Sequence, residues 1–297
     1  MDPNRFHGIY PILYAFFDAN GRPQREPIVA QVDAAIRHRA HGVAVLGLAT
    51  ETNKLDTGER RQILEWTAEA VGGRVPLAVT VAEPSVHGQA AFVRAARDAG
   101  ADWVILQPPP VSGMSESELL RFFGAVAQST DLPVAIQNAA QFLGVGLSNA
   151  ALRTLNRNHP NVCLLKGEAP AHVIERLVAD TQGAYRVFNG RGGMELPECL
   201  RAGCVGMIPA PECFDVQVRI YEAMRSGDEG EAERLYREIL PLIAFLMASI
   251  DTFVCYGKRV VARRLAIDVV HDRAPCQSPS EFGIAMTDRL SAALGAW

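Results

Sequence analysis

The sequence has little lysine, no paired cysteine motif and no long hydrophobic run. Its six cysteines include no C-x-x-C pair, and several lie in apolar stretches where a thiol behaves as a small buried hydrophobe, so neither a zinc framework nor a disulfide framework is expected. Neither H-E-x-x-H nor G-x-x-x-x-G-K-[ST] occurs, which removes two common catalytic motifs. The sequence therefore predicts no metal site and no cofactor.

Charge and hydropathy exclude two further classes of partner. The formal net charge is −4 with both signs mixed along the chain, so the basic stripe that binds nucleic acid is missing. The apolar run in MDPNRFHGIYPILYAFF is shorter than the ~20 residues that span a bilayer. It also lacks the basic start and small-residue end of a cleaved signal. We therefore expect a cytoplasmic protein that binds neither nucleic acid nor membrane.

Short apolar runs alternate with amphipathic segments over the first two thirds of the chain. The strand-like runs are 8–16, 42–47, 76–82, 102–107, 133–138, 161–166, 185–190 and 205–209. The helical patterns are 27–40, 57–71, 86–99, 115–128, 147–157, 170–180, 194–202 and 214–226, several of which begin near a capping residue such as Thr57, Ser115 or Ser148. A strand followed by a helix, eight times over, is typical of a (β/α)₈ TIM barrel.

The glycine pattern and the C-terminal part of the chain help to choose between a barrel and an open doubly wound sheet. A length of 297 residues suits either one barrel or two smaller domains. An open doubly wound sheet usually carries a glycine-rich fingerprint after its first strand, and YAFFDANGRPQ has none. After residue 228 the pattern is helical only. We therefore predict an α/β barrel over residues 1–228 and a C-terminal helical extension over 229–297 that packs on it.

Polar residues collect where the predicted strands end. In α/β barrels the loops after the carboxyl ends of the strands form the active site. Here these loops contain GLATETNK, QPPPVSG, QNAAQF, KGEAP and NGRGG. Lys166 ends the unbroken apolar run 162–165, whereas the only other lysines, Lys54 and Lys258, follow no such run. Lys166 is therefore the first candidate for a catalytic residue.

A lysine at a strand end has two plausible roles. Burial disfavours the charged ammonium, and a neutral amine can attack the ketone of a 2-oxo acid. The product is a protonated Schiff base, which serves as an electron sink for a neighbouring carbanion. The alternative is a structural lysine that extends its amine to solvent or pairs with Glu168. The residues alone support both roles equally.

The order of these segments resembles the dihydrodipicolinate synthase and N-acetylneuraminate lyase family. The loop GLATE, residues 47–51, is similar to the GTTGE turn of that family, and Lys166 matches its Schiff-base lysine. The longer run GLATETNKLDTGER adds to the match, and the likeness covers nearly the whole chain. The resemblance implies a class I Schiff-base enzyme, a small-molecule 2-oxo acid substrate such as pyruvate, and a homotetramer.

Two motifs depart from the family pattern. Where the synthases have YNxPxRTG, this chain has QNAAQFLG, so Gln137 replaces a proton-relaying tyrosine and Phe142 replaces a carboxylate-binding arginine. The tyrosine pair of TPYYN is absent from QPPPV. Glutamine forms hydrogen bonds but exchanges no proton at neutral pH, which argues against the synthase mechanism. The L-2-keto-3-deoxyarabonate dehydratases are more similar, since they carry this glutamine and a K-x-E arrangement, here Lys166 and Glu168.

The resemblance to this subgroup implies dehydration of a 2-keto-3-deoxy sugar acid. Once Lys166 holds C2 as an iminium, a base can remove a C3 proton, and the enamine then expels the C4 hydroxyl without a base at that hydroxyl. We expect Glu168 to be the acid–base group and Gln137 to orient the substrate carboxylate or polarise the leaving hydroxyl. The alternatives are a surface carboxylate at a helix start for Glu168 and a packing role for Gln137.

We expect the loops after the second and seventh strands to bind the substrate, through Ala49, Thr50, Glu51, Asn189, Gly190 and Arg191. The backbone N–H groups of Ala49 and Thr50 would hold its carboxylate, as the matching loop does in the family, while Glu51 braces that loop. The segment 189–191 would reach the distal end of the substrate, where Arg191 could pair with a carboxylate or hydroxyls. A solvated arginine and a phosphate-binding glycine loop are the alternatives for this segment.

Two other functions stay open. A pyruvate-dependent aldolase of the same family would need water or substrate hydroxyls in place of the missing tyrosine. A barrel that only binds a 2-oxo acid would explain the loss of both tyrosine motifs, although the retention of Lys166 argues against it. Detection of free pyruvate or of a dehydrated product separates the two enzyme activities.

Overall fold

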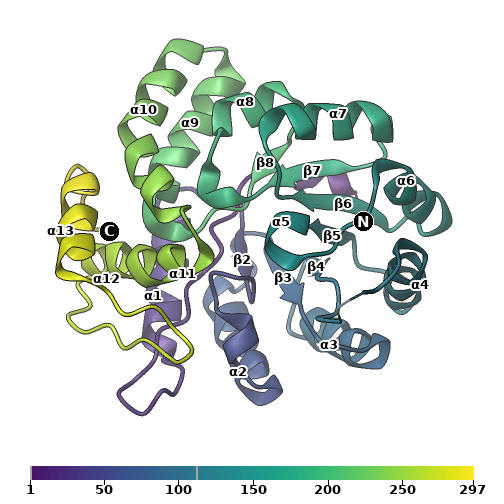
Figure 1. The fold of residues 1–297 in the computed structure, drawn as a ribbon, viewed down its shortest axis with the longest axis horizontal. Helices are drawn as coiled ribbons and strands as arrows, with labels where there is room; N and C mark the ends of the chain where they lie inside the picture. The colour runs from purple at the N-terminus through teal and green to yellow at the C-terminus, as the bar shows by residue number, and fades with distance from the viewer. Residues whose placement is uncertain (1, 112) are drawn as a thin grey trace.

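The structure is a computed structural model that describes residues 2–111 and 113–297 and forms a (β/α)₈ barrel (Figure 1). Eight parallel strands follow one another around the wall in the order β1-β8-β7-β6-β5-β4-β3-β2. Their bounds are β1 Gly8–Ile9, β2 Val43–Val45, β3 Leu77–Val81, β4 Trp103–Leu106, β5 Val134–Asn138, β6 Val162–Gly167, β7 Arg186–Asn189 and β8 Gly206–Met207. A parallel bridge between Ile12 and Ala44 joins the chain beyond β1 to β2 and closes the ring.

The helices that alternate with these strands cover the outside of the barrel (Figure 1). They are α1 Arg25–Arg37, α2 Thr57–Val71, α3 Val86–Asp98, α4 Glu116–Ala127, α6 Asn149–Asn158, α7 Ala171–Thr181, α8 Leu196–Arg201 and α9 Phe214–Ser226. The predicted barrel is confirmed. Ser115 and Ser148 cap α4 and α6 as predicted, whereas Asp56, and not Thr57, caps α2 through a capping box with Glu59.

Two local features differ from the expected pattern. The predicted strand 8–16 has only two residues in the regular ladder, because Pro11 has no N–H to donate to a neighbouring strand. Residues 10–17 are nevertheless buried. The loop after β5 contains a short helix, α5 Ala140–Leu143, which the sequence did not indicate. Shorter helical turns are η1 Pro3–Arg5, η2 Thr52–Lys54, η3 Arg191–Gly193 and η4 Pro211–Cys213.

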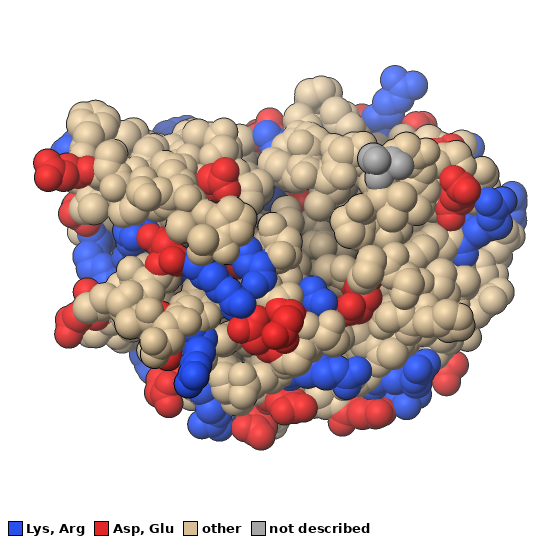
Figure 2. All heavy atoms as spheres, turned by 60° about the horizontal axis from the view of Figure 1, so that its bottom comes forward, with Lys and Arg blue, Asp and Glu red and all other residues tan. Residues whose placement is uncertain are grey.

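The C-terminal part is helical, as expected, but it is interrupted. It consists of α10 Glu229–Leu246, α11 Ile250–Thr252, the π-helical turn η5 Phe253–Gly257, α12 Lys258–Arg264 and α13 Glu281–Leu290. α10 lies beside α9, and α13 contacts both α10 and the turn η5 that precedes α12 (Figure 1). Within the described residues no single helix is long and apolar enough to cross a membrane, although α10 and 250–264, bent by 112°, would qualify as a pair. Figure 2 shows acidic and basic side chains interspersed over one face.

Aromatic side chains fill the inside of the barrel. The rings of Tyr10, Trp103 and Phe188 are fully buried, with centroids 5.4–5.6 Å apart. Leu164 belongs to the same interior cluster. Because side chains on a strand alternate between its two faces, Lys166, two residues further along β6, also faces the interior. The packed interior thus supports a lysine at the mouth of the barrel.

Removal of the largest interior ring should destabilise the barrel. Trp103→Ala is expected to lower the free energy of unfolding by about 3–5 kcal/mol, because it leaves a cavity between the buried rings of Tyr10 and Phe188. Phe282→Ala is the control, since Phe282 is 73% exposed. Urea unfolding followed by circular dichroism measures both. Equal stability of the two variants would show that the interior is not closely packed.

Candidate active site

Three polar side chains meet at the carboxyl end of β5 and β6. Lys166 lies directly opposite Gln137 in the pairing of these strands, so both side chains face the same side of the sheet. Glu168, just beyond β6, turns back toward the lysine: its Oε1 lies 3.1 Å from Lys166 Nζ. Gln137 Nε2 donates to Glu168 Oε2 at 2.9 Å. The three residues predicted for catalysis therefore form one connected group.

This group opens on a cavity and is shielded from bulk solvent. Lys166 is 3% exposed and Glu168 is 7% exposed, so the lysine does not extend its amine to solvent and the glutamate is not a surface carboxylate. The pairing of Lys166 with Glu168, the other form of the structural alternative, is present. The cavity has a volume of about 350 Å³, part of which is open to solvent. It is lined by Ile12, Leu48, Ala49, Phe142, Lys166, Glu168, Arg191, Gly192, Ile208, Ala210, Met247, Ile250 and Phe253. A small ligand in it would meet the lysine amine.

Gly190 makes room for the Glu168 carboxylate. A Cβ atom at position 190 would lie 2.3 Å from Glu168 Oε1 and 2.9 Å from its Cγ. Any side chain there would therefore push the carboxylate away from Lys166. The sequence analysis placed Gly190 at the distal end of the substrate, whereas the structure places it behind the acid–base candidate.

The loop after β2 lines the cavity with Leu48 and Ala49. The N–H groups of Ala49 and Thr50 donate to no protein atom of the described residues, which leaves them free for a ligand anion. The Thr50 hydroxyl accepts from Leu46 N at 3.0 Å and donates to Leu13 O at 2.6 Å. Leu46 and Glu51 have positive φ angles of 64° and 58°, a strained conformation for residues with side chains. The Thr50 side chain thus braces the loop.

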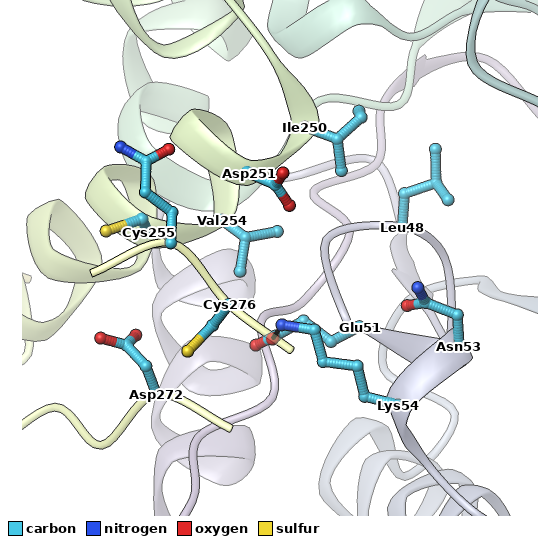
Figure 3. A pocket seen from close by; sticks show the side chains of 11 residues that line it. Leu48, Glu51, Asn53, Lys54, Ile250, Asp251, Val254, Cys255, Asp272 and Cys276 are labelled. Carbon is cyan, nitrogen blue, oxygen red and sulfur yellow. Dashed lines mark hydrogen bonds and ion pairs between the residues drawn. The ribbon is translucent and has the colours of Figure 1, made fainter. Parts of the chain in front are cut away.

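Glu51 is held below this loop by two lysines. Its Oε2 lies 2.5 Å from Lys54 Nζ, and its Oε1 accepts from Lys258 on α12. Figure 3 shows the Lys54 amine beside the Glu51 carboxylate in a second pocket next to the loop. Burial lowers the pKa of Lys258, and the Glu51 carboxylate opposes that effect. This geometry is that of a brace, the role expected for Glu51, although no sequence pattern indicated Lys258 as its partner.

The loop after β7 contributes one side chain to the cavity. Asn189 is fully buried, and its amide donates to Ala169 O at 2.8 Å while accepting from Gly190 N at 2.8 Å. It therefore holds the backbone and does not line the cavity. Arg191, with a φ angle of 54°, does line the cavity and donates to Glu195 Oε2 at 2.6 Å. Arg191 reaches the ligand space as part of an ion pair.

Sequence reasoning missed two buried groups near the mouth. Gln107, after β4, donates to Gln137 Oε1 at 2.8 Å. The Tyr14 hydroxyl donates to Glu212 on η4 and lies 3.2 Å from Phe253 O. Burial raises the pKa of the Glu212 carboxyl to about 7. The departure of QPPPV from the family pattern had drawn attention to the segment that contains Gln107. The contact of Tyr14 with Glu212 joins residues 198 positions apart, so no local sequence pattern could indicate it.

The fold and this site can now be compared with known proteins. A model of the Dihydrodipicolinate synthetase family matches residues 5–282. The chain belongs to this family. Among its relatives, the 4-hydroxy-tetrahydrodipicolinate synthase of Methanoculleus marisnigri is 29% identical over 254 residues, which cover 83% of this chain and 85% of that protein. YagE of Escherichia coli K12, whose proposed activity is that of a 2-dehydro-3-deoxy-D-gluconate aldolase, is 28% identical over 284 residues, or 92% and 93% of the two chains.

Solved structures of the family have the same fold. The crystal structure of YagE in complex with pyruvate superposes with a TM-score of 0.89 at 25% identity and covers 97% of both chains. The 4-hydroxy-tetrahydrodipicolinate synthase of Methylacidiphilum fumariolicum SolV gives a TM-score of 0.90 at 22% identity, over 97% of this chain and 95% of that one. The resemblance inferred from the GLATE loop and Lys166 is confirmed. This chain is therefore a Schiff-base lyase of the family, and its relatives include both synthases and aldolases.

The buried Glu212 should make stability depend on pH. Its pKa is about 7 in the folded protein against an ordinary value of 4.5, so the folded state holds the proton more tightly than the unfolded chain. The free energy of unfolding should therefore fall as the pH rises from about 4.5 to about 7, by about 3 kcal/mol. Glu212→Gln should lose this decrease. Urea unfolding at several pH values measures it, with the exposed Glu238→Gln as control; a decrease that persists in Glu212→Gln would contradict the assignment.

Proposed function

We propose that this lyase removes water from a 2-keto-3-deoxy sugar acid through a Schiff base at Lys166. The observation that carries the proposal is the buried group of Lys166, Glu168 and Gln137 at a small cavity. Within the described residues no tyrosine lines that cavity. A carboxylate is therefore the group available to move protons beside the lysine, and dehydration needs only one such group.

Schiff-base formation requires the amine to attack the ketone. The Lys166 ammonium gives a proton to Glu168, 3.1 Å away, and the neutral amine forms a bond to C2 of the substrate. The ketone oxygen then takes two protons, one from nitrogen and one from Glu168, and leaves as water. The product is a protonated iminium, and the Glu168 carboxylate is restored.

The elimination uses the same carboxylate twice. Glu168 removes a proton from C3, and the electrons of that bond move to the iminium nitrogen to give an enamine. The enamine then pushes out the C4 hydroxyl, which takes the proton from Glu168 and leaves as water. Hydrolysis of the resulting iminium releases an unsaturated 2-oxo acid, or its tautomer, and regenerates Lys166.

The cavity walls favour a short substrate. The free N–H groups of Ala49 and Thr50 are suited to the carboxylate next to the ketone. Beyond C4 the substrate would meet the Arg191 guanidinium and the apolar side chains of Phe142 and Met247. Phe142 stands where the synthases carry a carboxylate-binding arginine. These contacts support a five-carbon acid such as L-2-keto-3-deoxyarabonate over a substrate with a second carboxylate.

A pyruvate-dependent aldolase is the second candidate. The likeness to YagE, whose crystal structure contains pyruvate, favours it. Retro-aldol cleavage needs a base at the C4 hydroxyl, and Glu168 is the one carboxylate among the described residues that line the cavity. Free pyruvate from a panel of 2-keto-3-deoxy acids would support the aldolase, and a dehydrated product would support the dehydratase. Ligand binding without turnover would support a non-catalytic barrel. The homotetramer stays a prediction from the resemblance.

Pyruvate should be trapped on Lys166. Incubation with pyruvate and borohydride is expected to add the mass of a reduced pyruvate adduct to the peptide that contains Lys166, because borohydride reduces the iminium to a stable amine. The chain has only two other lysines, Lys54 and Lys258, and both are paired with Glu51, so they serve as internal controls. An unmodified Lys166 would remove the proposed function.

Removal of the carboxylate should separate Schiff-base formation from proton transfer. With Glu168→Gln, borohydride trapping of pyruvate at Lys166 should become slower but still go to completion, because water can carry the protons of Schiff-base formation during a long incubation. Exchange of the pyruvate methyl protons with deuterated water should slow by about 10²–10⁴-fold. Proton NMR measures this exchange. Glu175→Gln, on the exposed face of α7, is the matched control. If Glu168→Gln exchanges at the parent rate, another group is the base.

A further inference from the structure

Gln107 is a buried residue that the proposed mechanism does not use. It is the first residue after β4 and is 6% exposed, while Gln137, with which it bonds, is 1% exposed. Gln107 Nε2 donates to Gln137 Oε1 at 2.8 Å, and Gln137 Nε2 donates to Glu168 Oε2 at 2.9 Å. One line of hydrogen bonds therefore joins β4, β5 and the residue after β6. Water has little access to these atoms and cannot readily replace a missing partner.

The direction of these bonds is constrained by the chemistry of the amide. A carboxylate only accepts hydrogen bonds, so Gln137 must turn its NH₂ group toward Glu168. Its carbonyl oxygen then faces the other way and needs a donor, because a buried oxygen without one is costly. The Gln107 NH₂ group is that donor. Without it, Gln137 has less reason to keep its NH₂ group on Glu168.

Gln107 is itself held firmly in place. Its N–H donates to Val81 O at 3.0 Å, and its carbonyl accepts from the side chain of Gln89 at 2.9 Å. The next residue is Pro108, and a residue before proline is restricted to extended conformations. The strand-four motif QPPPV, which departs from the family pattern, thus presents one amide side chain from a stiff backbone.

We infer that Gln107 is a positioning residue that fixes the orientation of the Gln137 amide and thereby holds the Glu168 carboxylate beside Lys166. The inference rests on the proposed function, because it concerns the base of that mechanism. Gln107 forms no hydrogen bond with Lys166 or Glu168 and does not line the cavity. It acts on the reaction through Gln137 alone.

The effect of Gln107 on the Glu168 carboxylate does not come from charge. The charged groups that share the cavity with Glu168 are Lys166 on β6 and Arg191 on η3, and Arg191 is paired with Glu195. Among the described lining residues none belongs to β4 or to the segment that follows it. Gln107 is uncharged, so its influence depends on the direction of hydrogen bonds.

A double-mutant cycle on pyruvate methyl exchange tests this inference. Gln107→Leu should slow the exchange by about tenfold while borohydride trapping at Lys166 persists. In a Gln137→Leu background the same change should have less than about a twofold effect, because its only route to the site is gone. Equal effects of Gln107→Leu in both backgrounds would overturn the inference. Loss of trapping in the parent protein would instead overturn the proposed function.

Gln107→Glu gives a second test that keeps the size of the side chain. Its carboxylate would draw the Gln137 NH₂ group away from Glu168 and leave the Gln137 carbonyl facing Glu168, an arrangement that requires a proton on Glu168. The acid limb of the exchange rate against pH should therefore move by about one pH unit or more to higher pH. Asn161→Ala, which loses two amide hydrogen bonds at the opposite end of the barrel, should leave it in place. An unmoved limb in Gln107→Glu would contradict the inference.

Discussion

The ion pair between Lys166 and Glu168 is the interaction on which this site depends. Both groups are nearly buried, and a charge removed from water needs a partner and hydrogen bonds close at hand. The fold meets this need locally. Gly190 leaves space for the carboxylate, and Gln137 donates to its second oxygen. The pair can therefore remain beside a cavity in which a 2-oxo acid would displace solvent and meet the amine.

Pairing of a buried lysine with a glutamate recurs at the mouth of the barrel. The three lysines of the chain are each paired with a glutamate, two of them with Glu51. Glu51 and Leu46 adopt positive φ angles in the loop after β2, as Arg191 and Glu195 do in the loop after β7. Strained backbone of this kind persists only where its surroundings hold it. Ion pairs and a threonine hydroxyl hold the first loop, in which the N–H groups of Ala49 and Thr50 donate to no protein atom of the described residues.

The replacement of one tyrosine by Gln137 and the absence of the tyrosine pair from QPPPV change what this site can do. A tyrosine hydroxyl can give and take a proton, whereas an amide can only direct hydrogen bonds. With Gln107 and Gln137 in the network, the proposed mechanism assigns proton transfer to Glu168. One carboxylate suffices for a dehydration in which the same proton leaves C3 and returns on the departing hydroxyl. This is the chemical reason for proposing dehydration as the activity of this family member.

The sequence by itself determined the alternation of strands and helices, the barrel and the lysine at the end of β6, because hydrophobic periodicity and strand-end position are local properties. Its motifs also indicated Glu168 and Gln137. Only the tertiary structure decided that Asn189 and Thr50 brace backbone, that Gly190 accommodates a carboxylate, and that Gln107 contacts Gln137. These contacts join residues far apart in the chain, and their direction follows from how neighbouring strands align, which no local pattern records.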